Sequence, residues 1–144
     1  MNSSFAVARM RPHWPGVPHK VACPRDTSLA RCRRLEDTSG NCFEPEIFTA
    51  EVLNSFLLGC APAHCTYVDI GCNLGLFASH AAALGASVRC FEPAPFFAEA
   101  INESRKINGA NNDNWEVHNV AVVAEDALAN GVLHFHSTYQ PCGI

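Results

Sequence analysis

The segment Val68-Asp69-Ile70-Gly71-Cys72-Asn73-Leu74-Gly75 is an apolar run that ends in an acid and passes into a glycine-containing turn. The β-branched and aromatic residues 66–70 predict a short strand, and the Ala-rich residues 74–84 predict a helix that Gly85 ends. Glycine lacks a Cβ and tolerates positive φ, so such a turn lets a ligand approach the backbone, and the helix start offers free N–H groups. We therefore expect a strand, a tight turn and a helix, with a binding site at the turn.

A second unit of the same kind follows directly. Residues 87–92 predict a strand, and Pro93 keeps Glu92 extended, after which Pro95 opens a helix that runs to about Asn108. Further strands are predicted over residues 115–123 and 132–136. Strands that alternate with helices of this length imply parallel βαβ units, so the fold class is predicted to be α/β.

The chain divides into two parts. Residues 1–43 show no periodicity and are predicted to be an irregular basic arm, whereas the ordered domain is expected over residues 44–144. That domain should begin with a helix, because Pro45 suits a first helical position and apolar residues recur at helical spacing until Gly59.

Charge follows the same division. The first 34 residues hold seven Lys or Arg against one acid, and the remainder holds three against thirteen, for a net charge of −4. The basic arm could be an organellar targeting segment, but its prolines would interrupt the amphipathic helix that mitochondrial import prefers, so we expect a cytoplasmic protein. The arm is poor in aromatics and the body is acidic, which disfavours nucleic-acid binding. No apolar run approaches the ~20 residues of a membrane span.

The eight cysteines do not form paired CxxC knuckles, and no secretory signal region is visible. We therefore predict reduced thiols and no metal site. Cys72 and Cys90, at strand ends, are expected to serve as small buried apolar residues.

The acids and glycines around the turn suit a cofactor with an amine-bearing tail and a ribose. Asp69 would attract the ammonium, and the Glu92 carboxylate would accept both ribose hydroxyls. The dinucleotide fingerprint G-x-G-x-x-G differs, because the spacing here is Gly71-x-x-x-Gly75 and Asp69 would oppose a pyrophosphate. The pattern therefore favours S-adenosylmethionine over a nicotinamide cofactor.

Four blocks in order carry a resemblance to a known family: residues 68–75, Cys-Phe-Glu-Pro-Ala-Pro at 90–95, Lys-Ile-Asn-Gly at 106–109 and Asn-Val-Ala-Val at 119–122. Together they resemble the FkbM-type S-adenosylmethionine-dependent methyltransferases over residues 44–137. The resemblance implies a Rossmann-like class I methyltransferase fold, here partial, with strands 1 to 3, an extra strand and flanking helices. It also implies a cofactor site made of Asp69, Gly71, Asn73 and Gly75 at the methionine end, Glu92 at the ribose and Asn119 near the adenine, with Cys72 and Pro93 inside the two motifs.

The resemblance further implies methyl transfer, to an oxygen of an unidentified small-molecule, glycan or lipid-type acceptor. Family members continue through a fourth parallel strand, so this chain is expected to hold one wall of the pocket, with no identifiable general base, and to expose a sheet edge through which it could associate. Two alternatives stay open: a non-catalytic truncated remnant or cofactor-binding fragment, and a nicotinamide-dependent oxidoreductase.

Overall fold

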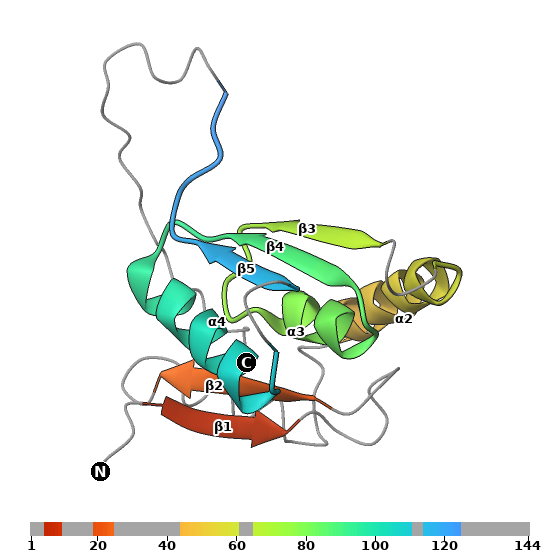
Figure 1. Cartoon of the computed structure of the whole chain (residues 1–144), viewed down its shortest axis with the longest axis horizontal. Coiled ribbons are helices and arrows are strands. Elements are labelled where there is room, and N and C mark those ends of the chain that lie inside the picture. Colours follow the sequence, from red (N-terminus) through yellow and green to blue (C-terminus); the bar gives the residue numbers. More distant parts are fainter. Residues whose placement is uncertain (1–4, 10–18, 25–43, 61–64, 111–113, 125–144) are drawn as a thin grey trace.

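The computed structural model describes residues 5–9, 19–24, 44–60, 65–110 and 114–124 (Figure 1). In chain order the elements are β1 (Phe5–Arg9), β2 (Lys20–Pro24), α2 (Glu44–Leu58), β3 (Thr66–Ile70), α3 (Leu76–Ala83), β4 (Ser87–Phe91), α4 (Pro95–Ile107) and β5 (Trp115–His118). None of the helices in these ranges has the length and apolar character needed to cross a membrane.

Strands β3, β4 and β5 form a parallel sheet in that order, and α3 and α4 connect them. The chain is therefore mixed α/β, as predicted. Both connecting helices lie on one face of the sheet (Figure 1), where Val88, Cys90, Ile101 and Trp115 are fully buried. On the opposite face of β3, Val68 and Ile70 are 53% and 62% exposed. Within the described chain β3 pairs with β4 alone and is an edge strand.

The predicted elements of the βαβ units are confirmed to within two residues, except the strand predicted over residues 115–123, which ends at His118. Here the Val120 N–H bonds back to the His118 carbonyl at 3.0 Å, a tight turn that takes the following residues out of the ladder. The strand predicted over residues 132–136 lies outside the described residues.

The prediction that residues 1–43 are irregular is wrong for two segments. Strands β1 and β2 pair antiparallel and lie on the far side of the helices from the sheet (Figure 1). Strand β2 docks on α4, where Ser104 accepts the Ala22 N–H at 2.7 Å and Asn108 both accepts from Lys20 N–H and donates to its carbonyl, at 2.9 and 2.7 Å. Because these side chains satisfy the backbone groups of β2, the strand persists where local sequence gives no signal for it.

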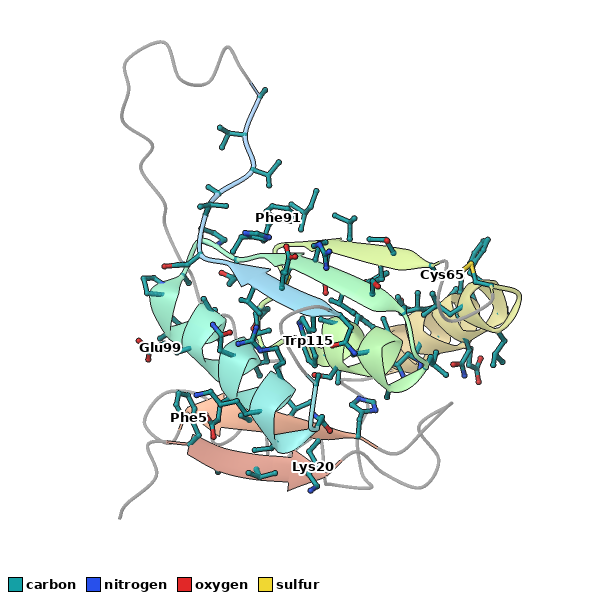
Figure 2. The ribbon with its side chains drawn as sticks, in the orientation of Figure 1. Phe5, Lys20, Cys65, Phe91, Glu99 and Trp115 are labelled. Atoms are coloured by element: carbon teal, nitrogen blue, oxygen red, sulfur yellow. A yellow bond between two sulfur atoms is a disulfide. The ribbon has the colours of Figure 1, made fainter. Side chains whose placement is uncertain are left out.

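The prediction of reduced thiols is also wrong in part. Cys60 and Cys65 form a disulfide across the connection from α2 to β3, and Cys23 is disulfide-bonded as well. Figure 2 labels Cys65 at this bond. The pair is only five residues apart, a spacing that is not diagnostic by itself, and the helix end and the strand start bring the two residues together. Cys72 and Cys90 are free and buried, as expected.

Candidate functional site

The turn after β3 is built from left-handed residues at every second position. Gly71, Asn73 and Gly75 have φ values of 78°, 52° and 73°. Asparagine is the non-glycine residue type that best tolerates this region, which accounts for Asn73 between the two glycines. A Cβ on Gly71 would meet nothing within 4 Å, whereas one on Gly75 would lie 2.9 Å from Ile101 Cγ1. Gly71 therefore leaves open space beside the backbone, and Gly75 lets α3 pack closely on α4.

Glu92 follows β4 and ties the two strand ends together. Its carboxylate accepts the Asn73 N–H at 2.8 Å and the Ala94 N–H at 2.9 Å, one on each oxygen. The residue is only 4% exposed. Each oxygen retains a second acceptor position, so the side chain keeps the capacity to bind hydroxyl groups, but these would have to reach a nearly buried carboxylate.

Asp69 lies on the helix-facing side of β3, next to the start of α3. Burial raises the pKa of its carboxyl above the usual value, and the negative charge of Glu92 adds to this, while hydrogen bonds from Cys72 and from the Ala78 N–H act in the opposite direction. Ala78 belongs to the first turn of α3, and that helix has no side-chain cap at Gly75. The Asp69 carboxylate thus lies where the helix dipole favours negative charge.

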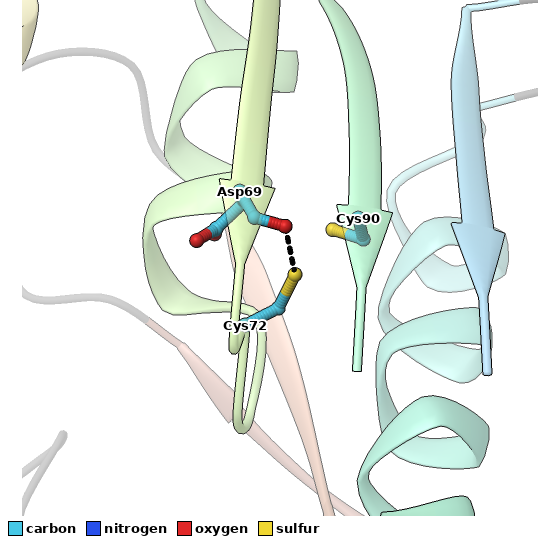
Figure 3. Close-up of side chains that lie close together, drawn as sticks. All are labelled: Asp69, Cys72 and Cys90. Carbon is cyan, nitrogen blue, oxygen red and sulfur yellow. Dashed lines mark hydrogen bonds between the residues drawn. The ribbon is translucent and has the colours of Figure 1, made fainter. Parts of the chain in front are cut away.

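Cys72 and Cys90 complete the cluster around Asp69 (Figure 3). The Cys72 thiol donates to the Asp69 carbonyl at 3.0 Å and lies 3.8 Å from the Phe91 carbonyl. A hydrogen bond with the Cys90 side chain, followed by burial and the nearby charges of Cys90 and Asp69, raises the pKa of Cys72 far above its ordinary value, so the thiol is neutral. Cys90 was not among the predicted site residues. The register of the parallel strands β3 and β4, which pairs Cys90 with Asp69, is what places Cys90 in the cluster.

Asn119 and Pro93 are brought to the same edge as Glu92. The Asn119 side-chain amide donates to the carbonyls of Glu92 and Pro93, at 2.8 and 3.0 Å, while the residue itself is exposed. Beside it the rings of Phe91 and His118 stack with centroids 4.9 Å apart. Asn119 therefore has a structural role in joining the ends of β4 and β5. All eight predicted site residues lie at the carboxyl ends of the three strands or in the turns that follow them.

The arrangement offers two carboxylates, open space over a left-handed turn and a helix start at one sheet edge. Two carboxylates within interaction range attract positive charge, and the carboxyl ends of parallel strands are where α/β sheets bind ligands. S-adenosylmethionine, a cationic sulfonium with an ammonium group and a ribose, is compatible with these donors and acceptors. A search against models of known protein families found no match, and no curated protein proved significantly similar to the chain.

Proposed function

We propose that this chain carries the cofactor-binding half of an S-adenosylmethionine-dependent methyltransferase of the FkbM type, with a partial class I methyltransferase fold. The observation that supports it best is the hydrogen bond between Glu92 and the Asn73 N–H. This bond joins the turn after β3 to the end of β4, which are two of the four sequence blocks that carry the resemblance.

In this proposal each residue has a defined task. Asp69 holds the ammonium group of the methionine tail, and the left-handed residues Gly71 and Asn73 shape the backbone against which that tail lies. Glu92 binds the ribose hydroxyls through its remaining lone pairs, which requires a small turn of the carboxylate toward solvent because it is 4% exposed. The cofactor, when bound, supplies an electrophilic methyl group, and the chain's share of the acceleration is to hold it in position.

Calorimetric titration with S-adenosylmethionine tests the proposal. We expect saturable binding by the folded protein, with losses in Asp69→Asn and Glu92→Gln because each change removes a negative charge from the proposed site. Glu99→Gln is the matched control, since Glu99 is an exposed acid on α4. No binding by a protein whose circular dichroism shows it to be folded, or equal binding by all four proteins, would refute the proposal.

A competition titration and an assay of methyl transfer separate the competing functions. A nicotinamide-dependent oxidoreductase would bind NAD in competition with S-adenosylmethionine, despite the charge of Asp69 opposite a pyrophosphate. Binding of S-adenosylmethionine without methyl transfer to any small-molecule, glycan or lipid-type hydroxyl would favour a cofactor-binding fragment. Cytoplasmic location remains part of the proposal, and the Cys60–Cys65 disulfide counts against it, because such bonds are rare in reducing compartments.

A further inference from the structure

We propose that Asp69, Cys72 and Cys90 form a binding site for a single thiophilic divalent cation of the Zn²⁺ class. Three separate pieces of backbone supply the ligands: β3 carries Asp69, the turn after it carries Cys72, and β4 carries Cys90. One carboxylate oxygen and the two sulfur atoms all lie within 4.8 Å of one another.

The distances are close to those that a metal requires. A tetrahedral Zn²⁺ with bonds of about 2.0–2.3 Å holds its ligand atoms about 3.5 to 3.8 Å apart. Separations of at most 4.8 Å exceed these values by no more than about 1.0 to 1.3 Å, so the three atoms need to move only a short way toward one another. In Figure 3 the sulfur of Cys90 points toward Cys72, whereas the Asp69 carboxylate is turned away from the two sulfur atoms and would have to turn toward them on binding.

The backbone holds these ligands in place. Asp69 and Cys90 are direct partners in the parallel register of β3 and β4, so their side chains leave the sheet on the same face. Cys72 is fixed by the left-handed residues on either side of it, Gly71 and Asn73, and both cysteines are buried. A site on strands and a constrained turn keeps its geometry better than one on a free loop.

The ligand chemistry selects the cation. Two sulfur ligands favour soft or borderline metals such as Zn²⁺ over Mg²⁺ and Ca²⁺, which prefer oxygen alone. Binding would displace the two thiol protons, and the cation would replace the hydrogen bond that the Cys72 thiol donates to the Asp69 carbonyl. Three protein ligands leave a fourth position for water, as in zinc sites that are not purely structural. This inference does not require the cofactor to bind, but both proposals use the Asp69 carboxylate, so a bound cation and the ammonium group would compete for it.

Titration with Co²⁺ tests the site, in protein whose free thiols are reduced and whose disulfides are intact. The absorption spectrum of bound Co²⁺ reports both sulfur ligation and tetrahedral geometry. We expect one equivalent to produce thiolate-to-cobalt charge transfer and tetrahedral bands that Zn²⁺ abolishes and Mg²⁺ leaves unchanged. Cys72→Ser and Cys90→Ser should each weaken Zn²⁺ binding by more than about tenfold, since loss of an outer partner alone costs 10- to 100-fold. The Cys60→Ser/Cys65→Ser variant should bind as the wild type does.

A second measurement uses the unaltered protein and so does not depend on the folding of a variant. Zn²⁺ should protect Cys72 and Cys90 from alkylation in mildly denaturing solution, with the modified sites identified by mass spectrometry. The proposal is overturned if the folded wild type shows no thiolate-to-cobalt band. It is equally overturned if the band persists in the Cys72→Ser/Cys90→Ser variant, or if Zn²⁺ leaves the alkylation of both cysteines unchanged.

Discussion

Gly75→Ala is expected to destabilise the protein through two separable effects. The residue has φ of 73°, and a left-handed conformation costs a residue with a Cβ about 1–2 kcal/mol. The added Cβ would also lie 2.9 Å from Ile101 Cγ1 and 3.3 Å from Cγ2, in a core where overpacking costs about 1–3 kcal/mol. The sum, about 2–5 kcal/mol, is a large part of the ~5–15 kcal/mol that stabilises an ordinary domain.

Gly109→Ala is the matched control for the backbone effect. Gly109 has φ of 72°, and a Cβ there meets nothing within 4 Å. We expect it to lower the free energy of unfolding by only about 1–2 kcal/mol. The gain from a less flexible unfolded chain is common to both substitutions and cancels in their difference.

Urea denaturation, followed through the fluorescence of the buried Trp115, measures these free energies. In an Ile101→Ala background, Gly75→Ala should cost no more than Gly109→Ala does, because both offending carbon atoms are gone. Equal costs for the two alanine variants in the wild-type background would show that the close approach of α3 to α4 does not constrain this position. An unchanged cost of Gly75→Ala in the Ile101→Ala background would refute the argument in the same way.

Three further predictions concern burial. Asp69→Asn should raise the free energy of unfolding at pH 7, because the raised pKa of the Asp69 carboxyl means that its ionised form opposes folding. The free energy of unfolding of the wild type should therefore increase as the pH falls through that pKa. The variant should lack this pH dependence. Ser104→Ala should lower the free energy of unfolding in urea by about 1–3 kcal/mol, because it leaves the buried Ala22 N–H without its acceptor. Ser55→Ala, at an exposed position, should lower it by less than about 0.5 kcal/mol. Burial, with the charge of His19, lowers the pKa of His80 to about 4. The contribution of neutral His80 to the free energy of unfolding is therefore fully present above pH ~6.5, and it should decline by up to about 3 kcal/mol as the pH falls toward ~4. A His80→Leu variant with the same acid profile would contradict this origin.

Most of the local structure could be predicted because the proline and glycine residues that begin or end elements act locally. Pro93 and Pro95 separate β4 from α4, and Gly85 and Gly109 end the two helices with φ values of 91° and 72°. The clustering of Asp69, Gly71, Asn73 and Glu92 followed from a single rule, that parallel strands bring their carboxyl ends to one edge. Cys90 was missed because its position beside Asp69 depends on strand register.

The apolar face of α2 shows a different limit. Apolar residues recur at helical spacing along α2, yet Leu53 and Leu57 pack on the core while Phe48 and Phe56 are 67% and 73% exposed. The helical spacing of apolar residues indicates that a helix is amphipathic, but it does not indicate which part of a wide apolar stripe contacts the neighbouring helix.

By itself, then, the sequence was enough to determine the strand, turn and helix elements from Thr66 to Ile107, because glycine, proline and β-branched residues restrict their own backbone. Only the tertiary structure decided that β2 lies against α4, because its hydrogen bonds join residues 82 and 88 positions apart. It also decided that Cys60 is bonded to Cys65 and that Glu92 holds the turn at Asn73. These contacts depend on how separate elements meet in space, which no local propensity encodes.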